Sequence, residues 1–451
     1  MKKDEGVIPL KVFKRVAKIG FSLSIALSLA ACSQPPQTTA PDAPSTPAPS
    51  TSDAPKPADT EKVKIVYARG HDATQGTAKL VEAFEQAHPN IDVEVREMPS
   101  DTGQSHDQYV TMFSAQSSEI DVFDLDVIWP AEFAQAGYLL PLDRLIEQDG
   151  IKTESFIKGA MDAGNFGGQQ WTLPKFIDAG LLFYRTDLVK EPPKTWDDLI
   201  KAAQAANGQG GTKFGYLMQA KQYEGLVCNF VEFSTAYGGK ILDEQGNVAV
   251  NNPGTIKGLK KMMEVVQSNF VPTNITTFTE TESHTAFIEG QSAFIRNWPY
   301  QFALAQDATQ SKIVDKIAIA PLPAGDAGSA AALGGWMGGI NKYTKHPKEA
   351  WEFLKFMTGP EGQEISAVHG GLAPTYLPVY EDADVQKASP LFANKDFING
   401  VSAAVSRPTT PIYPKISEVI QIEVSKALAG QQTAEQTVQN MEKAMKDLIQ
   451  K

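Results

Sequence analysis

The sequence has only two cysteines, Cys32 and Cys228, in 451 residues. If Cys32 is modified, no intrachain disulfide can form, so the fold must hold together through its core. The apolar context of Cys228 predicts a buried, inert thiol rather than a nucleophile. The six histidines are scattered and form no His-x-x-x-His pair, which argues against a zinc site. We expect neither a metal ion nor a cofactor.

Several motifs of common enzyme classes are also absent from the sequence. It contains no Gly-x-x-x-x-Gly-Lys-Ser/Thr loop, no dinucleotide-binding glycine spacing and no Gly-x-Ser-x-Gly elbow. Carboxylates are plentiful, so spacing alone leaves a pair of glycosidase carboxylates open. The formal charge of −12 and the lack of a basic stripe argue against nucleic acid as a partner.

The marked apolar run near the start, residues 19–31, is too short to span a bilayer as a permanent helix. Lysines and one arginine precede it, and Leu-Ala-Ala stands directly before Cys32. This three-part layout predicts an export signal over residues 1–31. The Leu-Ala-Ala-Cys sequence resembles the bacterial lipobox, which implies acylation of Cys32 and anchoring to a membrane. The alternative is an ordinary cleaved signal with an incidental cysteine.

Residues 32–60 are predicted to form a linker after the lipidated cysteine. Residues 33–60 contain eight prolines and no aliphatic or aromatic side chain larger than alanine. Such a segment buries too little apolar surface to offset the entropy of ordering it. The folded part then begins near Glu61 and runs for about 390 residues, a length that predicts two domains or lobes.

Strand and helix patterns alternate at the start of the folded part. Strands are predicted at Val63–Arg69, Ile91–Met98 and Ile120–Trp129, with helices at Thr77–Ala87 and His106–Gln116 between them. That order predicts parallel pairing through right-handed crossovers. Ligands of such open sheets gather beyond the carboxyl ends of the strands, where Asp126 and Trp129 lie.

The remaining chain gives a second mixed series. Strands are predicted at Gly180–Arg185 and Ser292–Arg296, and helices at Thr195–Ala206, Gly225–Tyr237, Pro253–Ser268, His284–Glu289, Pro347–Met357, Ile416–Leu428 and Thr433–Ile449. The glycine-rich segment 334–339 is interpreted as a break between elements.

Two tryptophans stand in glycine- or proline-rich segments. Trp298 precedes Pro299, and Trp336 follows Gly334-Gly335. Aromatic faces can bind the C–H surfaces of neutral sugars, while carboxylate and guanidinium groups bind their hydroxyls. For each tryptophan, a place in the core or at a lobe interface is an equal alternative. Arg407 precedes a proline in an extended stretch and is a candidate donor, with a surface salt bridge as its alternative.

From about Glu61 onward the chain resembles the family 1 solute-binding proteins of ABC importers, and most of all their trehalose/maltose-binding branch. The stretches that carry the resemblance are Gln222–Cys228, Arg296–Tyr300, Leu333–Trp336, Ala350–Phe353, Arg407–Pro408 and Tyr413-Pro414. The resemblance implies a two-lobed α/β fold like that of the type II periplasmic binding proteins, with the ligand in a cleft between the lobes. Three hinge crossings are expected near Pro174–Gly180, Leu322–Ala332 and Gly370–Tyr376. The N-terminal lobe would comprise 61–176 plus 325–372, and the C-terminal lobe 177–324 plus 373–451.

The same resemblance implies a set of ligand-binding residues. Asp126 and Asp178 would accept hydrogen bonds from sugar hydroxyls, and Arg407 would donate them. Trp298 and Trp336 would stack on two sugar rings, with the backbone of Gly335 against the ligand. Phe176 stands where this branch can carry a tyrosine, so one hydroxyl contact would be missing.

The function implied is that of a lipid-anchored, monomeric receptor and not of an enzyme. It would close on an α-glucoside of the trehalose, maltose or sucrose type outside the cytoplasmic membrane, facing the periplasm or the cell exterior. It would then deliver the sugar to the permease subunits of an ABC transporter. The alternatives are a receptor for glucosylglycerol or another small glycoside, a secreted glycoside hydrolase and a surface adhesin.

Overall fold

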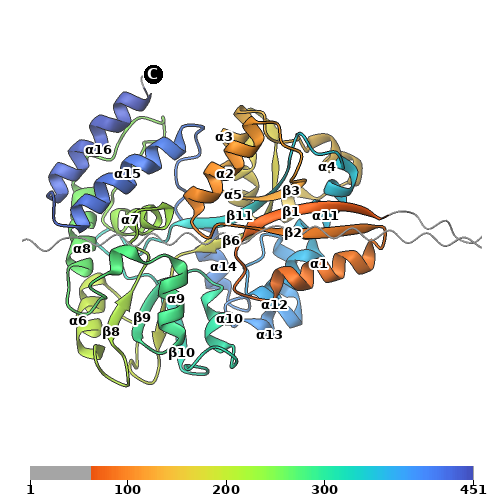
Figure 1. Ribbon diagram of the computed structural model, residues 1–451. Helices are drawn as coiled ribbons and strands as arrows, with labels where there is room; N and C mark the ends of the chain where they lie inside the picture. The colour runs from red at the N-terminus through yellow and green to blue at the C-terminus, as the bar shows by residue number, and fades with distance from the viewer. Residues whose placement is uncertain (1–61, 450–451) are drawn as a thin grey trace, which may run out of the picture. The chain divides into compact units, whose positions relative to one another are not determined.

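Two β-sheets organise residues 62–449, the part of the chain that the computed structural model describes (Figure 1). The predicted signal peptide over 1–31, the lipidation of Cys32 and the linker over 32–60 lie outside these residues and stay predictions. Among the described residues, no helix combines the length and the apolar character that crossing a membrane requires.

The first sheet has five strands in the order β2-β1-β3-β11-β6. Its strands are β1 (Val63–Gly70), β2 (Ile91–Met98), β3 (Val122–Asp126), β6 (Thr172–Ala179) and β11 (Leu333–Ile340). β1 runs parallel to β2 and β3, which confirms the predicted parallel pairing. β11 is antiparallel to both β3 and β6. β3 ends at Asp126 and not at Trp129, because Trp129 already caps the next helix.

The interpretation of residues 334–339 as a break was wrong, because they form most of β11 inside the first sheet. A Cβ on Gly338 would stand 2.4 Å from a methyl of Leu354, so the packed helix leaves no room for a side chain. Gly335 has φ +129°, a conformation that side chains disfavour, and a Cβ there would meet the carbonyl oxygen of Phe176 at 2.6 Å. The glycines therefore serve close packing within a strand.

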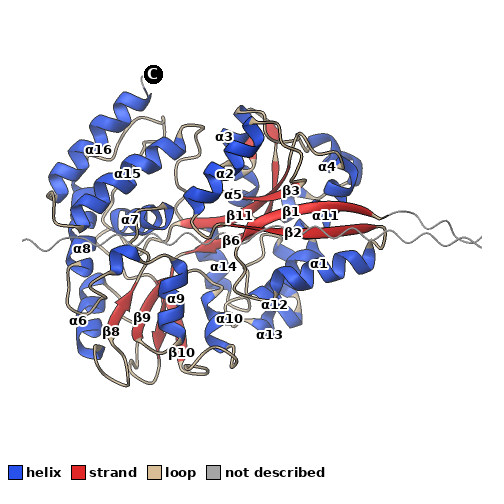
Figure 2. Ribbon diagram, viewed as in Figure 1, coloured by secondary structure: helices blue, strands red, loops and turns tan. Residues whose placement is uncertain are grey.

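The second sheet has four strands in the order β10-β7-β9-β8, seen apart from the first sheet in Figure 2. Its strands are β7 (Leu181–Arg185), β8 (Phe214–Leu217), β9 (Ser292–Asn297) and β10 (Ile317–Pro321), and a small hairpin joins β4 (Asn165–Phe166) to β5 (Gln169–Gln170). The chain leaves the first sheet for the second at Gly180 and returns between Pro321 and Leu333. The residue limits of the two lobes stay predictions.

Helices cover both sheets. They are α1 (Gly76–Ala87), α2 (Thr102–Ser114), α3 (Pro130–Gln135), α4 (Asp143–Asp149), α5 (Lys158–Ala163), α6 (Trp196–Ala206), α7 (Glu224–Ala236), α8 (Pro253–Val266), α9 (Glu280–Ile288), α10 (Gln301–Gln306), α11 (Pro347–Thr358), α12 (Pro360–Gly370), α13 (Ala383–Ala388), α14 (Lys395–Ser402), α15 (Tyr413–Leu428) and α16 (Ala434–Ile449), with 3₁₀ turns η1 (Thr153–Ser155), η2 (Ile275–Thr277) and η3 (Leu377–Glu381). α11 packs against strands of the first sheet, and α15 and α16 pack on α7 and α8.

Most predicted helices are confirmed, and their ends follow local capping. The Thr195 side chain accepts a hydrogen bond from the Asp198 amide and so begins α6. The helix predicted at His284–Glu289 begins earlier, at Glu280, because Thr279 and Glu282 form a capping box there. Cys228 is buried in the core beside the second sheet, and burial raises the pKa of its thiol to about 12. The prediction of a buried thiol is confirmed.

Candidate functional site

A pocket lies where segments from both sheets meet. From the first sheet come the loop after β1, the segment after β2 and residues of β3, β6 and β11, while the first turns of α7 and α9 and the residues after β9 face them. All seven predicted ligand-binding residues line this pocket, namely Asp126, Phe176, Asp178, Trp298, Gly335, Trp336 and Arg407. Their role in binding a ligand stays a prediction.

Arg407 holds two carboxylates together at one end of the pocket. Its Nη2 donates to Oδ1 of Asp126 at 2.9 Å, and its Nη1 donates to Oε1 of Glu224 at 2.8 Å. The arginine is 3% exposed, so its alternative interpretation as a surface residue was wrong. Its Nε is buried and has no hydrogen-bond partner within residues 62–449. Arg407 thereby ties β3 of the first sheet to the start of α7.

Glu224 is a site residue whose role the sequence analysis missed, although the matching stretch 222–228 contains it. Besides Arg407, its carboxylate accepts hydrogen bonds from the Tyr413 hydroxyl and the Ser417 hydroxyl of α15. Burial raises the pKa of Glu224, and the charge of Arg407 opposes that rise. The four side chains form one buried network, of which Arg407 and Glu224 line the pocket.

Asp178, near the end of β6, is satisfied less completely. Its Oδ1 is buried without a hydrogen-bond partner among the described residues. Burial raises the pKa of the carboxyl to about 7, Arg296 opposes the rise, and the charges of Asp126 and Glu280 add to it. A buried acceptor with spare capacity is costly unless something completes it. The hydroxyl group of a ligand would do so.

Trp298 is fixed on one face and at its nitrogen. The guanidinium carbon of Arg296 lies 3.8 Å from the indole centroid, and Nε1 donates to Oε1 of Glu280 at 3.2 Å. Arg296 is itself held by the buried carboxylate of Glu232. Trp298 is 8% exposed, packs in the core and still lines the pocket. The face that Arg296 covers is closed to a ligand.

Trp336 is more exposed and stands on the opposite side of the site. It pairs with Asp126 across β3 and with Phe176 across β6, and the strand bulges directly after it. Its ring meets that of Trp129 edge to face, with centroids 5.6 Å apart. Gly335 and Trp336, which precede this bulge, both line the pocket.

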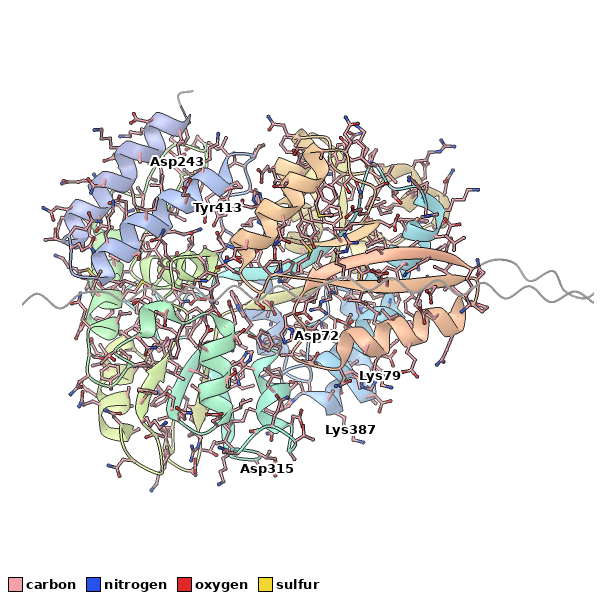
Figure 3. The ribbon with its side chains drawn as sticks, viewed as in Figure 1. Asp72, Lys79, Asp243, Asp315, Lys387 and Tyr413 are labelled. Carbon is pink, nitrogen blue, oxygen red and sulfur yellow. The ribbon has the colours of Figure 1, made fainter. Side chains whose placement is uncertain are left out.

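The loop after β1 contributes charged side chains that are already engaged. The Asp72 carboxylate accepts hydrogen bonds from the backbone and side chains of Thr74 and Thr77 and pairs with Arg69 at 3.1 Å. Burial works against ionisation, yet the Arg69 charge and these hydrogen bonds lower the pKa of Asp72 to about 2. Figure 3 labels Asp72, which lies by the first turn of α1.

A buried ion pair lies next to this loop. Lys175 Nζ donates to Oδ2 of Asp124 at 2.8 Å and to the Tyr67 hydroxyl at 2.6 Å. Burial lowers the pKa of Lys175 to about 8, while Asp124 raises it. Among residues 62–449, no group of three or more histidine, cysteine, aspartate or glutamate side chains could hold a metal ion.

Comparison with known proteins places these features in a family. A model of the family described as bacterial extracellular solute-binding protein matches residues 70–364. A probable ABC transporter-binding protein of Deinococcus radiodurans is 36% identical over 338 residues, which cover 72% of this chain and 79% of that protein. A maltotriose-binding protein of Pyrococcus abyssi is 26% identical, over 63% of this chain and 60% of that protein.

Solved structures agree with the sequence relatives. Maltose-bound T. maritima MalE3 is 35% identical, superposes with a TM-score of 0.81 and covers 86% of this chain and 100% of its own. A solute-binding protein of Thermotoga lettingae bound to α-D-tagatose is 25% identical, with a TM-score of 0.75 over 85% of this chain and 100% of its own. The predicted two-lobed α/β fold is confirmed by this likeness.

Proposed function

The chain belongs to the bacterial extracellular solute-binding proteins and is a sugar-binding component of an ABC transporter, and we propose that its ligand is a small α-glucoside of the trehalose, maltose or sucrose type. The observation that carries this proposal is the pairing of two indoles with an incompletely satisfied carboxylate in one pocket. Trp298 and Trp336 offer apolar faces to sugar rings, and Asp178 offers an acceptor to a hydroxyl.

The proposed mechanism is closure of the two lobes around the sugar. The ligand favours the closed state because it contacts groups from both sheets at once. Asp126 and Trp336 belong to the first sheet, whereas Trp298 follows a strand of the second. No bond is made or broken, and the permease receives the sugar unchanged. Anchoring through acylated Cys32 would keep this monomeric receptor at the outer side of the membrane, close to the permease.

A smaller ligand such as glucosylglycerol is the second candidate, and one observation favours it. The Asp72 carboxylate is occupied by the side chains and amides of its own loop, so this part of the pocket offers few free acceptors. A polyol needs fewer such contacts than a second sugar ring. The loop after β1 would then limit the pocket to a short ligand.

A thermal-shift and calorimetry panel of trehalose, maltose, sucrose, glucosylglycerol and glucose tests the proposal. A sugar at 100 times its dissociation constant adds roughly 2.7 kcal/mol to the free energy of unfolding. Trp298→Ala and Trp336→Ala are each expected to weaken binding of the sugar identified by about 1–3 kcal/mol. Trp171→Phe, outside the pocket lining, serves as the control.

Two outcomes would overturn this assignment. A flat response to every sugar of the panel removes the α-glucoside and the glucosylglycerol proposals together. Release of product from an α-glucoside on long incubation, lost in Asp178→Asn, would instead support a hydrolase. Unchanged calorimetric affinity in both tryptophan variants would remove the stacking of sugar rings from the proposal.

A further inference from the structure

Glu280, the first residue of α9, joins two aromatic side chains of the pocket. Its Oε2 accepts a hydrogen bond from the Tyr223 hydroxyl at 2.6 Å, and its Oε1 accepts one from Trp298 Nε1 at 3.2 Å. All three residues line the pocket. One carboxylate therefore sets the position of an indole and of a phenol that come from different segments of the chain.

The local fold holds Glu280 in this place independently of the pocket. The first turn of α9, which Glu280 begins, is fixed by the capping box, in which Glu282 accepts from the Thr279 amide at 2.8 Å and Thr279 caps the helix. Glu280 itself takes no part in the capping box. Its two carboxylate oxygens are directed instead to Tyr223 and Trp298.

Glu280 and Asp178 together give this wall of the pocket a negative character. Both hydrogen-bond donors of Glu280 are neutral groups, so its charge is not cancelled by them. Glu280 acts on Asp178 through its charge, and Oδ1 of Asp178 has no partner in the described part of the chain. The nearby arginines are already engaged, Arg407 with Asp126 and Glu224, and Arg296 with Glu232.

The chemistry of such a wall is selective. Carboxylate oxygens accept hydrogen bonds and donate none when ionised. A ligand group that meets them must bring donors, as the hydroxyls of a neutral sugar do. A phosphate or carboxylate on the same sugar would bring like charge, which costs affinity and so discriminates between partners.

We propose that Glu280 is a positioning and specificity-determining residue, which holds Trp298 and Tyr223 for the ligand and, with Asp178, excludes anionic glycosides. This inference rests on the proposed function of the pocket as a sugar site. It adds a residue that neither the sequence analysis nor the likeness to other proteins assigned.

The test compares Glu280→Gln with Glu289→Gln, a matched change at the exposed residue directly after α9, outside both the capping box and the pocket lining. A glutamine at 280 keeps one acceptor but presents an amide donor to the second partner, so one hydrogen bond is lost. Calorimetry at pH 8, above the pKa of Asp178, would use trehalose and trehalose 6-phosphate, and maltose and maltose 6′-phosphate. Thermal unfolding verifies that each variant is folded.

The expected result has two parts. Glu280→Gln weakens binding of the neutral sugar about tenfold, whereas Glu289→Gln leaves it unchanged. The affinity for the neutral sugar divided by the affinity for its phosphorylated form also falls about tenfold in Glu280→Gln. It falls further in the Glu280→Gln/Asp178→Asn double variant. If the ratio stays at the wild-type value, exclusion is steric and the charge part of the proposal is wrong.

A measurement without ligand separates this inference from the proposed function. The emission of Trp298 is obtained as the difference between the wild type and Trp298→Phe, and the same difference is taken in the Glu280→Gln background. Loss of the hydrogen bond from Trp298 Nε1 to residue 280 is expected to shift this difference spectrum. An unshifted difference spectrum together with wild-type affinity overturns the positioning role. Failure of the wild type to bind any sugar overturns the proposed function instead, while this spectrum still tests how Trp298 is held.

Discussion

Two aspartates border the same pocket and are satisfied in opposite ways. Asp72 accepts hydrogen bonds from Thr74 and Thr77 and pairs with Arg69, and its pKa falls to about 2. Asp178 keeps a buried oxygen without a partner in the described residues, and burial raises its pKa to about 7. The protein thus supplies hydrogen-bond partners to the carboxylate of Asp72 and leaves that of Asp178 without a full set.

The difference separates a residue that builds the pocket from one that is available to a ligand. Hydrogen bonds to the charged form stabilise it, whereas burial without such bonds destabilises it. A binding site commonly lowers the stability of the protein where a ligand later supplies the missing contacts. Membership of the pocket lining does not distinguish the two aspartates, because both belong to it.

The largest effect is expected when the completed aspartate is removed. Asp72→Ala leaves the Arg69 guanidinium without its carboxylate and frees the amides of Thr74 and Thr77, which should lower the free energy of unfolding by about 2–4 kcal/mol. Urea unfolding at pH 7 measures it. Asp72→Asn, which retains an acceptor, should lose less, and a loss below about 0.5 kcal/mol in Asp72→Ala would contradict a structural role.

The stability that Asp72 contributes should depend on pH in a defined direction. Because the pKa of Asp72 is lowered from 3.8 to about 2 by folding, its ionised form stabilises the protein above pH 4. This contribution is lost as the pH falls from about 4 to 2. The stability difference between wild type and Asp72→Asn should therefore shrink over that interval, as measured by urea unfolding at several pH values. A constant difference would mean that the charge of Asp72 contributes nothing.

The opposite result is expected at the incomplete aspartate. Folding raises the pKa of Asp178 to about 7, so its contribution to stability is present below pH 4 and is lost as the pH rises through 7. Asp178→Asn should therefore stabilise the unliganded protein at pH 8 by on the order of 1–3 kcal/mol and have little effect at pH 4. Thermal unfolding at both pH values measures this.

The second prediction for Asp178 concerns the affinity for the ligand. The same Asp178→Asn variant should bind its sugar about tenfold more weakly, because a charged acceptor makes the stronger hydrogen bond. Calorimetry with the sugar identified by the panel provides the measurement. A variant that is destabilised at pH 8, or that binds as tightly as the wild type, would place Asp178 with Asp72 among the purely structural residues.

The comparison also indicates what the sequence could predict. The strand Ile91–Met98 was predicted to the residue because its alternation is a local signal. Trp298, Trp336 and Arg407 were found as candidates because rare side chains in short, specific stretches carry the family resemblance. All three lie in the pocket lining.

Features that depend on distant partners could not be predicted. β11 was missed because its glycines are required by Phe176 and Leu354, which pack against them from other elements. Glu280 was missed because its partner Tyr223 is 57 residues away and nothing local distinguishes it from an exposed helix residue. The opposite pKa shifts of Asp72 and Asp178 follow from burial and from hydrogen bonds made in the folded chain. The sequence alone therefore does not distinguish the two aspartates.

Asp101 uses one carboxylate oxygen within its own segment and the other across the pocket, and its ion pair should show the smallest effect. Its Oδ1 caps α2 by accepting from the amides of Gly103 and Gln104, while its Oδ2 meets Nζ of Lys221 at 2.7 Å. Asp101 follows β2 of the first sheet and Lys221 follows β8 of the second, so this ion pair joins the two sides of the pocket.

Lys221→Gln should weaken sugar binding by less than about fivefold, because the Lys221 side chain is 37% exposed and such pairs contribute about 0.2–1 kcal/mol. The loss should appear as faster dissociation in stopped-flow fluorescence and disappear at 1 M salt, where exposed charges are screened. Asp101→Asn keeps the helix cap and should match it, with no further loss in the double variant. Lys355→Gln, which breaks a pair with Asp149 away from the pocket, should leave dissociation unchanged. Additive losses would show that the two residues act separately, so that Asp101 behaves as Asp72 does and serves only its own segment.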